Sequence, residues 1–243
     1  MTTTEPAAAR SRRGPRLSTD RVLRAAVEFA DDSGIEAVTM RQLARRLGVE
    51  AMALYNHVAN KEALMDGMIS VVLGEIIDAT AEITGDWKTA LRRRILAARE
   101  VMLRHGWAPG VLESRADPGE HLNRYYDALI GLFRDGGFSL DLTHHVLHAL
   151  GTRAFGYTHE PWDDSQPPPD PALLARQMAG AYPNIAAMLE HVSHEPNTTL
   201  GWCDDQFEFE FALDVLLEGL ERRRDTEQSR TRTPEAPPDS SHS

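Results

Sequence analysis

Two histidines at helical spacing are the residues of this chain best suited to metal chemistry. His144 and His148 stand four residues apart, so one face of a helix would present two imidazoles to a metal ion. With His159 and Glu160 they would form the ligand set of a metalloenzyme. However, no third ligand lies close to the pair in sequence, and no nucleophile elbow or phosphate loop accompanies it. We therefore expect an ordinary surface or interface pair, with no catalytic site, no metal and no cofactor, and keep the metalloenzyme as a remote alternative.

The composition of the chain excludes several classes of protein. Cys203 is the single cysteine, so it can form no internal disulfide and lacks the companions of a structural zinc site. Of the 243 residues, 42% are hydrophobic and 26% are charged, which is typical of a soluble globular protein. No apolar run is long enough to cross a bilayer, and no apolar segment follows the N-terminal arginines as in a secretory signal. We expect a cytoplasmic protein with no membrane partner.

Charge is distributed unevenly along the chain. The net charge is -11, yet residues 1–61 carry ten Lys and Arg against seven Asp and Glu, whereas residues 62–243 carry 16 against 30. A polyanion such as DNA would therefore be bound by the N-terminal quarter of the chain.

Residues 39–61, TMRQLARRLGVEAMALYNHVANK, contain the signals of two short helices joined by a sharp turn. Thr39 followed by Gln42 fits a helix-capping box, and Gly48 permits the turn. Val49 and Leu54 would point inward, leaving the outer face of residues 50–57 for the major groove. The pattern predicts a helix-turn-helix, although a capped helical hairpin without DNA contacts would show the same signals.

The residues expected to face DNA share a position on the outer side of this motif. Tyr55 and Lys61 are expected to clamp phosphates, whereas residues 51–53 offer only apolar contacts, for instance to the methyl groups of thymines. The full set of expected DNA-binding residues is Thr39, Arg41, Ala51, Met52, Ala53, Tyr55, Asn56, His57 and Lys61.

The remaining elements are also expected to be helices. Ser18 and Gly34 would begin and end a helix before the motif, and Asn60 would cap another that runs to about residue 80. No strand-like alternation appears in the rest of the chain, where helical spans are expected near residues 86–105, 119–135, 139–158, 170–181, 184–193 and 204–224.

The apolar residues between Phe207 and Leu220 point to a contact between subunits. They lie on more than one face of their expected helix, and a helix exposed to water could not sustain this. One face can pack inside its own domain, while the other meets a second copy in a four-helix bundle with residues 140–157. The alternative is a wholly internal helix in a monomer.

The motif resembles that of the tetracycline-repressor family. The resemblance rests on Thr39, Leu43-Ala44, Leu47-Gly48-Val49, Leu54-Tyr55, His57 and Asn60-Lys61, and a weaker one covers residues 136–140 and 207–221. It implies a homodimeric transcriptional repressor, not an enzyme, that leaves a roughly palindromic DNA operator when a small-molecule inducer binds. An activator, or a regulator that needs no ligand, would carry the same DNA-binding heads.

The resemblance also gives a fold class and a domain plan. It implies an all-α protein with an N-terminal three-helix helix-turn-helix domain and a larger helical domain for ligand binding and dimerisation. The expected plan is a disordered basic arm at 1–17, the DNA-binding domain at 18–65, the ligand-binding and dimerisation domain at 66–224 and a disordered tail at 225–243.

The expected ligand site combines aromatic and polar residues of the middle region with one position taken from the resemblance. Members of the family that bind tetracycline hold it as a magnesium chelate through a histidine and a glutamate of the other subunit. The nearest match places Leu112 where the histidine should be and Glu160 at the glutamate, so we expect a largely apolar or aromatic inducer that needs no metal. The candidate lining is Trp107, Leu112, His148, Phe155, His159, Glu160 and Met178.

Overall fold

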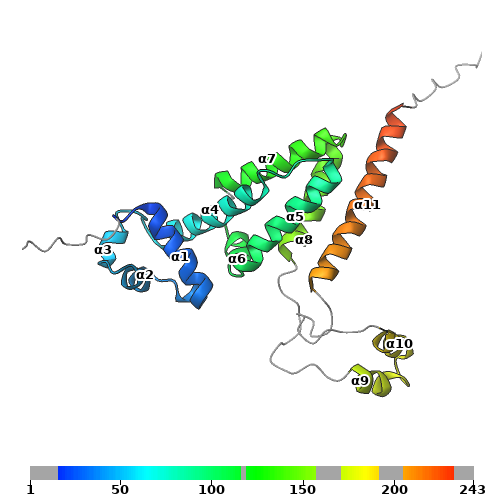
Figure 1. The fold of residues 1–243 in the computed structure, drawn as a ribbon, viewed down its shortest axis with the longest axis horizontal. Coiled ribbons are helices and arrows are strands. Elements are labelled where there is room, and N and C mark those ends of the chain that lie inside the picture. Colours follow the sequence, from blue (N-terminus) through cyan, green and yellow to red (C-terminus); the bar gives the residue numbers. More distant parts are fainter. Residues whose placement is uncertain (1–15, 116–118, 157–170, 192–204, 233–243) are drawn as a thin grey trace, which may run out of the picture. The chain divides into compact units, whose positions relative to one another are not determined.

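The computed structural model describes residues 16–115, 119–156, 171–191 and 205–232. Within these ranges the chain forms eleven α-helices and one short 3₁₀ helix, and it contains no strand (Figure 1). The expected all-α class is therefore confirmed. A search of the same residues finds no helix that is both long and apolar enough to span a membrane.

The chain divides into two compact units that differ from a simple cut along the sequence. The first comprises Met1–Asp78 together with Glu100–Arg124, and the second comprises Ala79–Arg99 together with Tyr125–Ser243. Residues 100–124 thus lie in the same compact unit as the N-terminal helices.

The first helix, α1 (Thr19–Ser33), begins and ends where the sequence indicates. The hydroxyl of Ser18 accepts a hydrogen bond from the backbone N–H of Arg21 at 3.2 Å, which satisfies a donor that the first turn leaves free. At the other end the N–H of Gly34 donates to the carbonyl of Ala30 at 2.8 Å. A 3₁₀ turn, η1 (Ile35–Ala37), then leads toward the motif.

The helix-turn-helix consists of α2 (Met40–Leu47) and α3 (Ala51–Leu54). The hydroxyl of Thr39 accepts from the N–H of Gln42 at 3.3 Å, which confirms the predicted cap of α2. Between the helices Gly48 adopts the left-handed conformation with φ 67°, which a residue with a side chain rarely takes. The second helix is shorter than the span 50–57 expected from the sequence. Residues 55–57 form a turn instead, and the N–H groups of His57 and Val58 both donate to the carbonyl of Leu54.

The fourth helix, α4 (Lys61–Thr80), packs closely against α1. The side-chain oxygen of Asn60 accepts from the N–H of Ala63 at 2.8 Å, as predicted for a capping residue. Gly67 of α4 faces the side chain of Leu23, where a β-carbon would collide with it. A glycine at this position therefore leaves room for the Leu23 side chain in the conformation that it adopts here.

A short helix that the sequence did not predict, α6 (Ala108–Glu113), follows in the same unit. Pro109 lies in the first turn of α6, where a proline loses no hydrogen bond.

In the second unit, the portion of α5 (Trp87–Arg104) that precedes residue 100 is joined to α11 (Asp205–Arg232) by a fork of ion pairs. The guanidinium of Arg92 lies 2.7 Å from an oxygen of Asp214 and 2.6 Å from an oxygen of Glu210. These two carboxylates raise the pKa of Arg92, and hydrogen bonds from Gln206 and Arg92 lower the pKa of Glu210. The ion pairs of the fork therefore favour the charged forms of Arg92 on α5 and Glu210 on α11.

Aromatic rings fill the core where α7 (Gly119–Asp135) turns into α8 (Leu140–Gly156). The ring of Phe138 lies 4.7 Å from the ring of Trp87 and 5.2 Å from the ring of Phe133, in both cases edge to face. All three side chains are buried.

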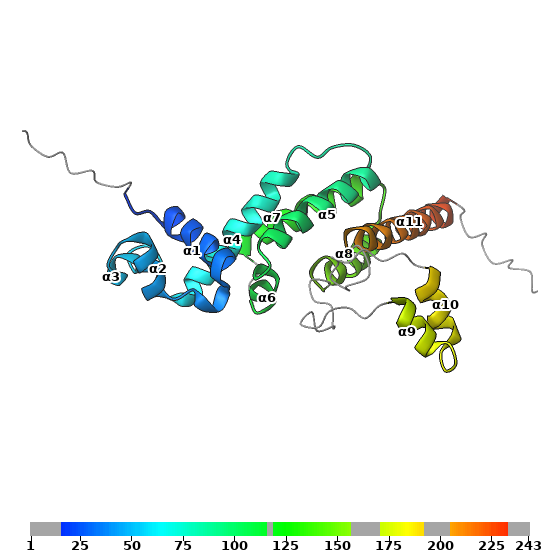
Figure 2. The same cartoon turned by 60° about the horizontal axis from the view of Figure 1, so that its bottom comes forward.

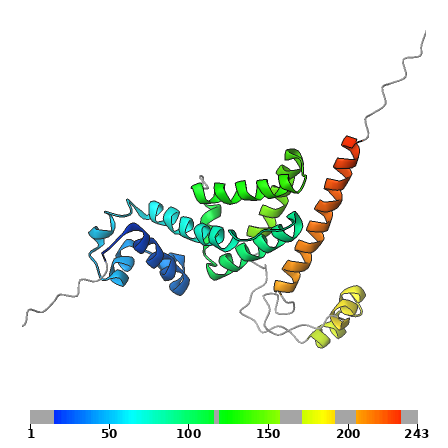
Figure 3. The same cartoon turned by 45° about the horizontal axis from the view of Figure 1, so that its top comes forward.

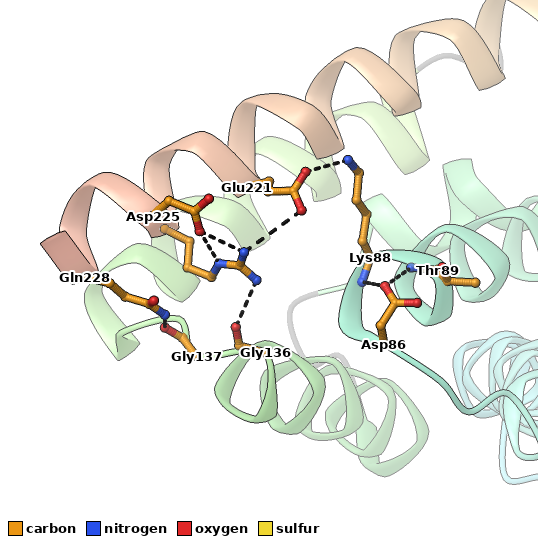
Figure 4. A network of polar contacts seen from close by, with 9 residues as sticks. Asp86, Lys88, Thr89, Gly136, Gly137, Glu221, Asp225 and Gln228 are labelled. Carbon is orange, nitrogen blue, oxygen red and sulfur yellow. Dashed lines mark hydrogen bonds and ion pairs between the residues drawn. The ribbon is translucent and has the colours of Figure 1, made fainter.

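The final helix extends beyond the point at which the sequence indicated a disordered tail. Helix α11 continues from residue 225 to Arg232, as Figure 2 shows in its orange to red portion. Figure 4 shows that Lys88 reaches Glu221, at 2.8 Å, and that Gln228 donates to the carbonyl of Gly137, at 3.0 Å. Ser139 also donates to Glu227. These contacts with the loop before α8 stabilise the polar last turns of α11, whose sequence is typical of a disordered tail.

Helices α9 (Pro171–Met178) and α10 (Pro183–His191) form a small hairpin (Figure 3). Ala175 and Ala186 are buried between them, and Met178 packs against this pair.

Candidate nucleic-acid interface

The recognition helix has one buried anchor and an apolar outer surface. Leu54 is 0% exposed, whereas Met52 is 74% exposed and Tyr55 is 46% exposed. Ala51 and Ala53 are half-buried. The outer surface of residues 51–55 therefore offers methyl and thioether groups and one phenol, and the nearest amide that could hydrogen-bond to a base edge is that of the exposed Asn56.

The arginines of α2 differ in how much of their charge is available to DNA. Arg46 pairs with Asp32 of α1, and its guanidinium lies over the ring of Phe29, so its role is to hold the two helices together. Arg45 donates to the side-chain oxygen of Gln42 at 2.9 Å. Arg41 is exposed and forms no ion pair within the described residues. Arg41 is therefore the arginine of α2 best placed to meet a phosphate.

The other expected DNA-binding residues lie at the ends of the neighbouring elements. Thr39 is exposed, although its hydroxyl already caps α2. Asn56 and Lys61 are exposed and His57 is half-buried. All nine expected residues thus fall within consecutive elements of the first compact unit, and their contact with DNA remains a prediction.

The expected ligand-binding residues lie on several different elements, and some of them fall outside the described residues. The indole N–H of Trp107 donates to Asp31 of α1 at 2.7 Å, so this residue contacts the N-terminal helices. Leu112 is half-buried on α6, His148 is exposed on α8, and Met178 packs within the hairpin of α9 and α10. The side chain of Phe155, and residues His159 and Glu160, lie outside the described part of the chain.

The histidine pair does not extend to a metal site in the described structure. The rings of His144 and His148 are exposed and lie 4.7 Å apart between centroids. Across the described ranges, no group of three or more His, Cys, Asp and Glu residues could hold a metal ion.

An apolar stripe on α11 is open to solvent in the single chain. Phe207, Phe211 and Val215 recur every four residues and are 63%, 59% and 53% exposed. Leu217, which the sequence placed among the candidates for the subunit seam, is 1% exposed and belongs to the interior of its own unit. Helix α11 therefore has an exposed apolar face that a second copy could contact. Phe207, Phe211 and Val215 form this face, and Leu217 does not.

Comparison with known proteins identifies the chain. Residues 22–68 match the family of bacterial regulatory proteins called tetR, and residues 80–224 match the tetracyclin repressor-like C-terminal domain. The second match alone covers more than half of the chain. The chain belongs to the TetR family.

Relatives and solved structures of the TetR family agree with this assignment along most of the chain. The tetracycline repressor protein class D of Escherichia coli is 33% identical over 211 residues, covering 85% of this chain and 90% of the relative. The HTH-type transcriptional repressor DrrR1 of Streptomyces coeruleorubidus is 29% identical over 230 residues, covering 87% and 81%. The solved structure of a possible TetR family transcriptional regulator from Streptomyces coelicolor A3(2) is 28% identical, with a TM-score of 0.66, and covers 84% of this chain and 99% of that one. As a TetR-family member the chain is a transcriptional regulator and not an enzyme.

One polar cluster of this TetR-family chain escaped sequence reasoning entirely. Asp31 contacts both His105 and Trp107, which are more than 70 residues away in the chain. No local spacing links these residues, so only the fold reveals the contact.

Proposed function

We propose that this chain is a transcriptional repressor that binds a roughly palindromic DNA operator as a homodimer and leaves it when a small-molecule inducer binds. The observation that carries the proposal is the helix-turn-helix of the first unit, in which Leu54 anchors α3 while Met52 and Tyr55 face outward. The family assignment and the relatives that are themselves repressors support it. Such a regulator would act in the cytoplasm.

Selection of bound duplexes from a random DNA pool tests the proposal. A two-fold symmetric regulator should enrich two half-sites related by a palindrome, with centres about one helical turn or a multiple of it apart. Affinity for the enriched duplex should fall steeply as salt rises, because phosphate contacts release counterions. Enrichment of no duplex, or affinity that ignores salt, would contradict the proposal.

A separate experiment decides whether the protein represses or activates transcription. Deletion of the gene should raise transcription next to the genomic copies of the selected operator. A fall in that transcription would instead identify an activator with the same DNA-binding heads.

We further propose that the inducer differs from magnesium-tetracycline, although relatives of the chain are tetracycline repressors. Leu112 offers no lone pair to a metal ion and lies half-buried on the short helix α6. Loss of a direct metal ligand removes both a bond and the geometry that orients a chelate. A largely apolar or aromatic molecule, recognised without a metal, fits such a site better.

Titration of tetracycline and magnesium into the protein bound to its selected operator tests this proposal. Fluorescence anisotropy of the labelled duplex should stay constant at micromolar drug, with or without a chelator. Metal-dependent release of the duplex would contradict it. The Leu112→His variant is the matched comparison, because it restores an imidazole at the position in question.

A further inference from the structure

Five residues of the first unit form a polar cluster centred on a buried histidine, here called the Asp31 cluster. The Nδ1 atom of His105 lies 2.9 Å and 3.0 Å from the two carboxylate oxygens of Asp31, and its Nε2 atom lies 3.2 Å from Glu75. Trp107 donates to Asp31 at 2.7 Å, and Arg104 donates to Glu75 at 3.1 Å. The two carboxylates thus face the nitrogen atoms of His105, Trp107 and Arg104.

The cluster joins three parts of the chain that are far apart in sequence. Asp31 lies near the end of α1, which supports the helix-turn-helix, and Glu75 lies on α4. His105 and Trp107 lie between α5 and α6. Because all of them belong to one compact unit, the imidazole connects α1 to α4 directly.

The geometry around His105 requires a particular protonation state. A neutral imidazole has one N–H donor and one lone pair, so it can donate to a single carboxylate. Hydrogen bonds to Asp31 and Glu75 together require both ring nitrogens to carry protons. When the proton is lost, one carboxylate faces a lone pair instead of a donor, and the connection between α1 and α4 weakens.

Two further donors contact the carboxylates that face this ring. Arg104 contacts Glu75, and Trp107 adds an uncharged donor to Asp31, so both carboxylates keep one partner when His105 is neutral. Helix α7 brings one more titratable group to α4, because His121 lies beside Gly74. The side chain of His105 is only 9% exposed, so it is in no position to contact a DNA phosphate itself.

We infer that His105 is a positioning residue that makes operator binding depend on protons, holding α1 to α4 when protonated and releasing it when neutral. The inference rests on the proposed DNA-binding function. A fixed α1 orders the helix-turn-helix before DNA arrives, so less conformational freedom is lost on binding. Operator affinity should therefore be highest when His105 carries both protons and should fall when a rise in pH removes one of them.

Direct contact of His57 with DNA would give a pH dependence of the same sign, so the test starts from the His57→Gln variant. Its affinity for the selected duplex is measured by fluorescence anisotropy from pH 5.5 to 8.5 at constant ionic strength. We expect a loss of about fivefold across this range. Addition of His105→Gln should reduce that loss to less than about twofold.

Two further variants separate positioning from folding. Asp31→Asn changes a partly exposed carboxylate and should also flatten the pH profile, even if His105→Gln proves too unstable to use. Asp20→Asn breaks an exposed ion pair with Arg24 on the same helix and should keep the profile of the parent. Thermal unfolding of each variant at pH 6 and pH 8 shows whether a change of affinity follows a change of stability.

A spectroscopic measurement makes the inference testable without DNA. At pH 6, ¹H–¹⁵N spectra of labelled protein should show both ring nitrogens of His105 carrying protons, with Asp31→Asn removing one protected N–H. If no duplex binds at any pH, the proposed function fails, and this spectrum still decides the state of the ring. A profile unchanged by His105→Gln and Asp31→Asn, an affinity that rises with pH, or a singly protonated ring at pH 6 would overturn the inference.

Discussion

Met52 and Leu54 are separated by one residue in α3, yet Met52 is 74% exposed and Leu54 is 0% exposed. The helix therefore keeps its place through Leu54 and presents Met52 to its surroundings. A thioether side chain at this position can read DNA only through shape and apolar contact.

We predict that Met52 contacts the methyl groups of thymines in the operator. Replacement of single thymines by deoxyuridine removes only that methyl group, and at the contacted position affinity should fall about fourfold per half-site, as expected for about 0.8 kcal/mol per buried carbon. Anisotropy with a series of substituted duplexes measures the effect. In Met52→Ala the same substitution should have little effect, and an equal loss in both proteins would contradict the prediction.

Lys61 is expected to contact a phosphate from the first turn of α4, where it is exposed. Lys61→Ala should weaken binding to all duplexes alike and lower the slope of log affinity against log salt by about one unit per half-site, which is about two units for the dimer on a palindrome. The matched control is Lys88→Ala, because Lys88 pairs with Glu221 in the other unit. A change of sequence preference in Lys61→Ala would show instead that this residue reads bases.

The exposed stripe of α11 gives a direct test of the homodimer. Phe211→Asp should yield a folded monomer, because a charge in an apolar contact between subunits costs several kcal/mol while the side chain lies outside the core of its own unit. Leu217→Asp should lower the thermal stability of the subunit itself, since Leu217 is buried there. Sedimentation with circular dichroism separates the two effects. Leu103→Asp, at an exposed leucine of α5, is the control and should remain dimeric.

Burial raises the pKa of the Tyr125 phenol to about 12, with Tyr126 adding to the effect and Arg94 opposing it. Below pH 10 the phenol is protonated in both the folded and the unfolded chain, so it contributes no pH dependence. Between pH 10 and 12 the unfolded chain loses the proton first, and the free energy of unfolding should fall by roughly 1.4 kcal/mol per pH unit. Urea unfolding at pH 9 to 11.5 should show a shallower decline for Tyr125→Phe. The exposed Tyr182→Phe is the control, and parallel curves for wild type and Tyr125→Phe would contradict the assignment.

The features that sequence reasoning predicted correctly depend on local chemistry. The hydroxyls of Ser18 and Thr39 and the left-handed Gly48 act within one turn of the residues they stabilise, so their spacing alone indicates the helix boundaries. The end of α11 was missed because Glu227 and Gln228 look like a solvated tail until the loop before α8 supplies their partners. The Asp31 cluster was missed for the same reason, since it depends on contacts between distant parts of the chain.

The contacts at the end of α11 have a practical consequence for work with this protein. Arg224 donates to the carbonyl of Gly136 at 3.3 Å, and Gln228, one turn later, donates to the carbonyl of Gly137. These hydrogen bonds stabilise the bend between α7 and α8. A fluorophore, affinity tag or fused reporter should therefore be attached beyond Arg232. A truncation before Arg224 would remove both contacts and expose the edge of the aromatic cluster around Phe138, over which Arg224 lies, and this favours aggregation during expression.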